Sequence, residues 1–197
     1  MPKNFSVKCD NVEIVKHAAQ PANINQAYKF CPLCTGKFIT RDVLGDEYTR
    51  LVCPDCSYIY YSNPHPTVIA IIEKKDQLLL VKRKNDPHAG FWDLPGGFVE
   101  SGQNLETALA AELEEEIGVG IKSSQYFASF VSKYPTQHMK RSIVGIAFKV
   151  EVASENFQAK SDVTAVKYFP KNDLPKIAPL QDVQLAIKKL LKEDGLN

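Results

Sequence analysis

Three glutamates in the middle of the chain have the spacing of a metal site. Glu112, Glu115 and Glu116 stand at positions i, i+3 and i+4 of a segment that we expect to be helical, so they share one face. Carboxylates this close repel one another unless a cation neutralises them, and oxygen ligands suit a hard divalent ion such as Mg²⁺ or Mn²⁺. Taken alone, a Glu-Leu-Glu-Glu-Glu run is also typical of a solvated helix face.

The segment around these glutamates has the marks of a helix with defined ends. Asn104 is a suitable N-cap, and Gly118 suits the position after the last turn, where the backbone becomes left-handed. The pair Gly96-Gly97 predicts a glycine turn that opens the segment. Apolar residues recur every four positions beside the acidic face: Leu109, Leu113 and Ile117.

Four of the five cysteines form a second candidate metal site. They are arranged as two Cys-x-x-Cys pairs separated by eighteen residues: Cys31, Cys34, Cys53 and Cys56. Two such pairs can close a tetrahedral thiolate site on Zn²⁺, whose role is then structural because no coordination position stays open. The alternatives are two disulfides or unrelated surface thiols. Disulfides are not expected in a chain without a secretion signal.

Residues 90–100 and the following helix resemble the Nudix hydrolases. The family's sequence box is Gly, five residues, Glu, seven residues, then Arg-Glu-apolar-any-Glu-Glu-any-Gly-apolar. Here Gly97 is followed by five residues, Gln103, seven residues and Ala111–Val119. The resemblance implies that the metal-binding carboxylates are those of Glu112, Glu115 and Glu116.

Two positions depart from the family's box. Its first glutamate is Gln103 here, and its arginine is Ala111. In the family these two residues resemble a supporting charge pair, and losing both leaves no unpaired charge behind. We therefore expect a metal site with weaker support rather than no site. A catalytically weak or inactive Nudix-fold protein that senses or binds a nucleotide is the alternative.

The resemblance also suggests where substrate and further metal ligands lie. Arg83, in a basic run at the end of an expected strand, would meet a phosphate, although a solvated strand end fits equally. Gly96 and Gly97 would allow close approach of metal or phosphate, since they have no side chain.

An acid beyond the box would complete the site. Asp162 fits the family's position for an additional metal-binding acid, and Glu155 is a rival. The proton acceptor is expected to be Glu115 or Glu116, with Asp162 or Glu155 as the alternatives outside the box.

The remaining pattern predicts an α/β fold in several parts. Expected strands cover residues 67–72, 77–83, 125–133, 142–152 and 163–169, and an amphipathic helix covers 181–192. The order suits the Nudix α/β/α sandwich with a mixed β-sheet, preceded by a small N-terminal zinc ribbon. We expect an extension over residues 1–27, the ribbon over 28–63 and the Nudix hydrolase domain over 64–197.

A zinc ribbon fused before a Nudix domain is similar to the NADH pyrophosphatases and to shorter proteins acting on ADP-ribose, FAD or nucleotide sugars. Residues 120–134 lack the Ser-Gln-Pro-Trp-Pro-Phe-Pro signature of the NADH group. The resemblance therefore implies a metal-dependent pyrophosphohydrolase whose first candidate substrate is ADP-ribose or a related ADP-linked diphosphate. Its products would be a nucleoside monophosphate and a second phosphorylated compound.

Composition limits the partners. The chain has 24 basic and 23 acidic residues, so nucleic acid is not an expected partner. Tyr58, Tyr60 and Tyr61 beside scattered lysines leave an RNA-binding ribbon as an alternative. The first residues lack a signal peptide's apolar stretch and no run has transmembrane length, so we expect a cytoplasmic protein without a membrane partner. Nudix relatives often dimerise, which makes a homodimer a candidate assembly.

Overall fold

The chain divides into two compact units between Ser62 and Asn63. The structure is a computed structural model that describes residues 28–135 and 140–196. The expected extension over residues 1–27 lies outside the described residues. No helix among the described residues has both the length and the apolar character needed to cross a membrane.

The first unit is a small antiparallel sheet with the strand order β1-β2-β3. Its strands are β1 (Ile39–Asp42), β2 (Thr49–Val52) and β3 (Ile59–Tyr60). Gly45, with φ of 81°, lies in the connection between β1 and β2, where glycine is favoured. A few buried side chains form the core: Cys31, Phe38, Leu51 and Cys53, with Tyr58 and Tyr60 packed against them.

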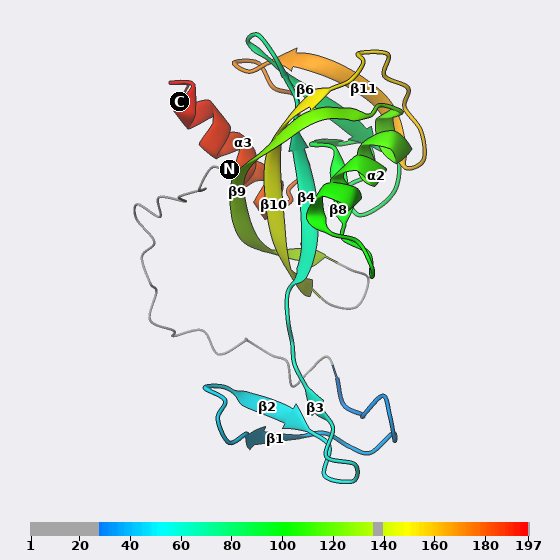
Figure 1. Ribbon diagram of the computed structural model, residues 1–197. Coiled ribbons are helices and arrows are strands. Elements are labelled where there is room, and N and C mark those ends of the chain that lie inside the picture. Colours follow the sequence, from blue (N-terminus) through cyan, green and yellow to red (C-terminus); the bar gives the residue numbers. More distant parts are fainter. Residues whose placement is uncertain (1–27, 136–139, 197) are drawn as a thin grey trace, which may run out of the picture. The chain divides into compact units, whose positions relative to one another are not determined.

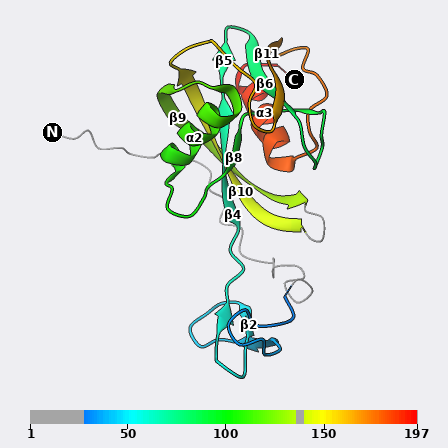
Figure 2. The same cartoon turned by 90° about the vertical axis from the view of Figure 1, so that its right-hand side faces the viewer.

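The second unit contains two sheets (Figures 1 and 2). The larger has the order β8-β4-β10-β9, with β8 (Gly96–Phe98), β4 (His65–Ile71), β10 (Lys140–Val152) and β9 (Ile121–Pro135). The smaller has the order β11-β6-β5, with β11 (Val163–Pro170), β6 (Gln77–Arg83) and β5 (Glu73–Lys74), and β7 (Trp92–Asp93) pairs with β6. Because β4 and β10 are parallel while the other pairs are antiparallel, the larger sheet is mixed.

The central strands are buried on both faces, and this explains the layers. On β4, Val68 and Ala70 belong to a core that contains α2 (Leu105–Ile117), whereas Ile69 and Ile71 belong to a core that contains α3 (Gln181–Glu193). Neighbouring residues of β6 alternate between the same two cores. Successive side chains of a strand point to opposite faces, so each face requires a cover. Figures 1 and 2 show α2 and α3 on opposite faces, which makes an α/β/α sandwich.

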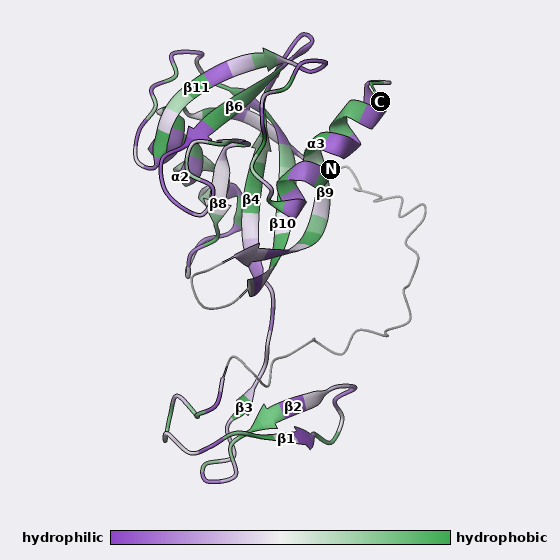
Figure 3. Ribbon diagram, turned by 180° about the vertical axis from the view of Figure 1, so that it is seen from behind, coloured by the Kyte–Doolittle hydropathy of each residue, from purple (hydrophilic) through white to green (hydrophobic). Residues whose placement is uncertain are grey.

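Both helices begin and end as their sequences predict, to within a residue. The side chain of Asn104 accepts a hydrogen bond from the Thr107 amide, and Gly118 closes α2 with φ of 70°. The stripe formed by Leu109, Leu113 and Ile117 is fully buried. Figure 3 shows hydrophobic and hydrophilic residues alternating along α3, in agreement with its predicted amphipathic character.

The segment before α2 differs from the prediction. Gly96 and Gly97 do not form a turn but belong to β8, which pairs antiparallel with β4 in the register Ile69↔Gly96 and Val68↔Gly97. A Cβ on Gly96 would lie 2.1 Å from the Val68 carbonyl oxygen, so only glycine can approach β4 this closely. The turn follows at Ser101-Gly102, and β8 thus runs beside the helix that carries the glutamates.

Candidate metal and substrate site

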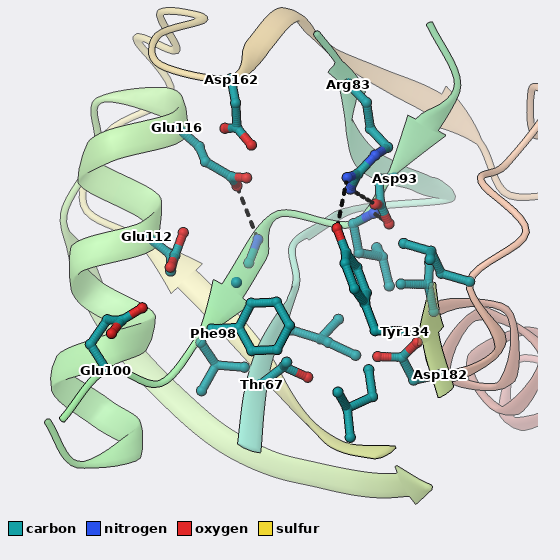
Figure 4. Close-up of a pocket in the computed structure, with 18 residues that line it drawn as sticks. Thr67, Arg83, Asp93, Phe98, Glu100, Glu112, Glu116, Tyr134, Asp162 and Asp182 are labelled. Carbon is teal, nitrogen blue, oxygen red and sulfur yellow. Dashed lines mark hydrogen bonds and ion pairs between the residues drawn. The ribbon is translucent and has the colours of Figure 1, made fainter. Parts of the chain in front are cut away.

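A pocket of about 260 Å³ opens in the second unit between β4, β8, α2 and the start of α3. Its wall is strongly acidic, and Arg83 is the only lysine or arginine among the described residues that line it. Figure 4 shows Glu112, Glu116 and Asp162 along one wall and Arg83, Asp93 and Tyr134 across from them. Six acids line the pocket: Asp93, Glu100, Glu112, Glu116, Asp162 and Asp182.

Strand β8 fixes the two glutamates of α2 that line the pocket. The Gly96 amide donates a hydrogen bond of 3.0 Å to Oε2 of Glu116, which is 7% exposed. A Cβ on Gly97 would lie 2.4 Å from Oε1 of Glu112. The predicted role of these glycines was to leave room for metal or phosphate. In the structure, the missing side chain of Gly97 leaves room for the Glu112 carboxylate, and that of Gly96 leaves room for the Val68 carbonyl.

Asp162 reaches the same wall because the segment before β11 is bonded to the end of α2. The amides of Gln158 and Lys160 donate to the carbonyl oxygens of Ile117 and Glu116, each at 2.9 Å. These carbonyls are among those that a helix end leaves without intrahelical partners. The Lys84 amide then donates to the Asp162 carbonyl at 2.7 Å, which holds that residue against the end of β6.

The two glutamates on this wall, Glu112 and Glu116, hold their protons more tightly than usual. Burial, followed by the charges of Glu115, Asp162 and Glu100, raises the pKa of Glu112 to about 7. Burial also raises the pKa of Glu116 well above its ordinary value, although the bond from Gly96 opposes this. Negative charge is therefore in excess here, and a divalent cation would relieve it.

Two other predicted acids lie elsewhere. Glu115 is exposed and does not line the pocket, and its Oε1 accepts a 3.0 Å hydrogen bond from the Ser161 hydroxyl. Glu155 is exposed and forms an ion pair with Lys74. Of the two candidates outside the box, Asp162 is therefore the one that the structure brings to Glu112 and Glu116.

Arg83, the predicted phosphate-binding residue, lines the pocket, but its guanidinium group is already engaged. It donates to Oδ2 of Asp93 at 2.7 Å, to the Pro87 carbonyl at 2.9 Å and to the Tyr134 hydroxyl at 3.3 Å. Burial raises the pKa of Asp93 to about 6 despite the opposing effect of Arg83. Since a guanidinium group has five N–H donors, Arg83 can hold Asp93 and still offer a donor to an anion.

The ribbon brings its four cysteines together. Their sulfur atoms lie within 4.8 Å of one another, and three of the pairs are separated by 3.4 to 3.7 Å. A tetrahedron with Zn–S bonds of about 2.3 Å has edges of about 3.8 Å, so the set fits zinc. All four thiols are free, which excludes the disulfide alternative in this structure. The Leu33 amide also donates to Cys31 Sγ at 3.4 Å.

Comparison with known proteins identifies both units. The NUDIX domain family matches residues 63–191, and the family described as Nudix N-terminal, a zinc ribbon, matches residues 29–62. The chain belongs to the Nudix family. Since residues 63–191 make up most of the chain, the fold expected from the box is confirmed.

Several relatives are named hydrolases. An ADP-ribose pyrophosphatase of Methanocaldococcus jannaschii is 33% identical over 153 residues, which cover 76% of this chain and 89% of that protein. The NAD-capped RNA hydrolase NudC of Vibrio parahaemolyticus is 26% identical over 175 residues, and the match spans 63% of that protein's length. The crystal structure of a NUDIX hydrolase from Nitrosomonas europaea has a TM-score of 0.65 at 29% identity, covering 85% of this chain and 93% of that one.

The structure also accounts for the departures from the Nudix box. The side-chain oxygen Oε1 of Gln103 accepts a 3.0 Å hydrogen bond from the backbone amide of Glu100. The backbone amide of Gln103 in turn donates to the Glu100 carbonyl at 3.0 Å. A neutral amide oxygen can therefore close this loop. Ala111 is exposed on α2, where it leaves no unpaired group.

Sequence reasoning did not assign several residues that line the pocket. Asp93 and Tyr134 carried no signal of their own, because they reach the pocket through long-range strand pairing, and Glu100 lies in the loop between β8 and α2. Two other residues of the pocket have a recognisable signal in the sequence. Thr67 is a polar residue at the start of a buried apolar strand, and Asp182 is an acid on the buried face of α3.

Proposed function

We propose that the chain is a divalent-metal-dependent pyrophosphohydrolase. Its substrate would be a nucleoside diphosphate linked to another group, with ADP-ribose or a related ADP-linked diphosphate (FAD, NADH or a nucleotide sugar) as first candidates. The observation that carries the proposal is the wall formed by Glu112, Glu116 and Asp162, on which burial raises the pKa of both glutamates. Relatives named ADP-ribose pyrophosphatase and NAD-capped RNA hydrolase support the same chemistry.

The proposed metal ligands are Glu112, Glu116 and Asp162, and Glu115, which lies outside the pocket on the same helix, is a further candidate. A bound Mg²⁺ or Mn²⁺ would neutralise the diphosphate and lower the pKa of a coordinated water. Glu116 is held in place by the Gly96 amide, so its orientation does not depend on the ligand. The acid that accepts the water's proton is proposed to be Glu116 or Asp162, the two candidates that line the pocket.

The other side of the pocket would bind the rest of the substrate. Arg83 is proposed to meet a phosphate oxygen with a donor that its bond to Asp93 leaves free.

Zinc would hold the ribbon folded through Cys31, Cys34, Cys53 and Cys56. We also propose the division into a ribbon over residues 28–63 and a hydrolase domain over 64–197. Sedimentation of the purified chain would test a homodimer.

A substrate panel with product identification tests the activity. Purified protein is incubated with ADP-ribose, FAD, NADH and UDP-glucose, in Mg²⁺, in Mn²⁺ and with a chelator. We expect metal-dependent release of AMP and ribose 5-phosphate from ADP-ribose. Tight binding of ADP-ribose with no turnover in either metal would contradict the enzymatic proposal and favour a nucleotide-binding role.

A further inference from the structure

Asp182 is a buried acid that the metal site does not use. It is 5% exposed, lies in the first turn of α3 and lines the same pocket as the glutamates. Its Oδ1 accepts a hydrogen bond of 3.2 Å from the Ser132 hydroxyl. No ion pair joins it to a lysine, arginine or histidine within the described parts of the chain. A buried carboxylate without a cation is costly, which calls for further hydrogen-bond donors.

The fold makes room for this acid. A Cβ on Gly145 of β10 would lie 2.8 Å from Oδ2 of Asp182, so any other residue there would push the carboxylate away. The strand thus lets the carboxylate approach its backbone closely. Ser132 bonds to Oδ1 of Asp182, and Oδ2, which accepts no hydrogen bond from a described residue, remains for a ligand.

Thr67 is an independent sign of a ligand at the same end of the pocket. It is 7% exposed, and its Oγ1 is buried without a hydrogen-bond partner among the described residues. Buried polar atoms in folded proteins nearly always have a partner. Thr67 lines the pocket on β4, and Figure 4 shows it with Asp182 beyond the rings of Phe98 and Tyr134.

The surroundings suit a flat ring. Phe98 and Tyr134 pack edge to face, with centroids 5.3 Å apart and planes at 81°. Aliphatic side chains complete this end of the pocket: Ile143, Leu180 and Val183. The whole pocket, at about 260 Å³, is near the small end of the range for small-molecule sites, so it suits one ring-sized group beside the phosphates.

We propose that Asp182 and Thr67 are specificity-determining residues that bind the nucleobase of the substrate. The carboxylate accepts a hydrogen bond from an exocyclic amino group of the base, and the Thr67 hydroxyl bonds to a ring nitrogen beside it. The site therefore prefers bases that carry an amino group over bases that lack one. This inference rests on the proposed function, because the base enters the pocket as part of a nucleoside diphosphate.

Product nucleotides test the preference without requiring turnover. AMP and purine riboside 5′-monophosphate differ only in the 6-amino group, and their binding is measured by calorimetry in buffer containing MgCl₂. A hydrogen bond to a charged acceptor predicts that wild-type protein binds AMP about tenfold more tightly or better. 2′,3′-Dideoxy-AMP, which keeps the amino group, should bind as AMP does. Loss of affinity for that probe, with equal binding of the other two, would place the ribose diol here and overturn the assignment.

Two isosteric substitutions locate the preference. Asp182→Asn keeps an acceptor for Ser132 but turns a donor toward the base, so the AMP advantage should fall to about onefold. Thr67→Val should weaken binding of both nucleotides several-fold. The matched controls are Asp173→Asn and Thr49→Val, whose side chains are exposed outside the pocket, and both should keep the wild-type preference.

Thermal stability separates ligand binding from a structural role. A hydroxyl that has no hydrogen-bond partner in the free protein does not stabilise the fold. Thr67→Val should therefore leave the Tm unchanged or raise it. A lower Tm together with wild-type nucleotide affinity would overturn the assignment of Thr67. An AMP preference that survives in Asp182→Asn would overturn the assignment of Asp182.

The two proposals fail separately. If no diphosphate is hydrolysed but AMP is preferred and Asp182→Asn abolishes the preference, the base site stands and the proposed enzyme does not. If ADP-ribose is hydrolysed with an unchanged base preference in both pocket variants, the enzyme stands and the base site does not.

Discussion

The four sulfur atoms of the ribbon converge on one point, whereas the acids of the pocket stand around an open space. Within the described residues, the cysteines are the only group of three or more ligand side chains whose donor atoms lie within 4.8 Å of one another. The acids proposed to bind the metal, Glu112, Glu116 and Asp162, come from α2 and from the segment before β11, and they border a pocket of about 260 Å³. One site has the geometry to close around a single ion, and the other leaves room for a substrate.

This difference separates a metal that folds a domain from a metal that would act on a ligand. A four-thiolate site offers no free position, so its binding energy goes into folding. The ribbon has a small core of its own, which makes it dependent on such a staple. The second unit has two extensive cores and should fold without a metal at its acids.

The largest effect is expected from breaking the closed site. Cys53 is completely buried, and Cys53→Ser should abolish zinc binding and unfold the ribbon, because structural zinc contributes roughly 10–16 kcal/mol in small zinc domains. Metal analysis should fall from about one zinc per chain to none. The nearby substitution Ser57→Ala serves as control and should retain zinc. A variant that keeps full zinc content would contradict the four-thiolate assignment.

Breaking the open site should remove activity and leave the fold. Glu116→Gln should lower kcat about a hundredfold or more, as expected for a group that positions or deprotonates the water. Its Tm at pH 8 should not fall, since the pKa of Glu116 is raised and a neutral side chain avoids burying its charge. Glu114→Gln, an exposed neighbour that pairs with Lys160, should keep both activity and zinc. Unchanged turnover in Glu116→Gln would refute its role.

A change in the glycine strand tests the positioning of Glu112. Gly97→Ala places a Cβ about where Glu112 Oε1 lies, at 2.4 Å, so the flexible carboxylate must move. We expect a smaller loss of kcat, about tenfold, with little change in Tm, because displacing a support costs less than removing a ligand. Gly120→Ala meets only the Cβ of Ala153 at 4.0 Å and is the matched control. Equal activity in the two variants would show that the strand does not position Glu112.

The smallest expected effect is the change in the Tm of the second unit with pH. The pKa of Glu112 is raised to about 7 and that of Asp93 to about 6. A raised carboxyl pKa contributes stability that is present below the unfolded value and is lost as the pH rises through the folded value. The Tm of the second unit without added Mg²⁺ should therefore fall between pH 5 and pH 8.

Metal binding at the acids should show the opposite trend. Mg²⁺ must displace a proton from Glu112, so its affinity should rise up to about tenfold per pH unit below pH 7 and level off above. Calorimetric titration of Mg²⁺ between pH 6 and pH 8 measures this. A pH-independent affinity would indicate that Mg²⁺ binds outside the pocket.

Local features of the sequence predicted the elements well, because their causes are local. Asn104 and Gly118 set the ends of α2, and the continuous apolar runs predicted strands buried on both faces. The predicted turn at Gly96-Gly97 was wrong, because these residues pair with β4, a strand almost thirty residues earlier in the chain.

The site was predicted in part, for the same physical reason. Helical spacing places Glu112 and Glu116 on one face, but the same spacing did not reveal that Glu115 lies exposed beside Ser161. The residues at the other end of the pocket come from β4, β9 and α3, and only the folded sheet brings them together. Thr67 and Asp182 show what a local signal can still offer, as polar residues on buried faces.

Anomalous diffraction can locate both metals in one crystal. Crystals grown with zinc-loaded protein are soaked with Mn²⁺ and a non-hydrolysable ADP-ribose analogue, and the two metals are located by their absorption edges. We predict zinc among the four cysteines and manganese between Glu112, Glu116 and Asp162, in contact with the diphosphate. Manganese bound elsewhere, with these acids directed into solvent and the analogue outside the pocket, would contradict the account.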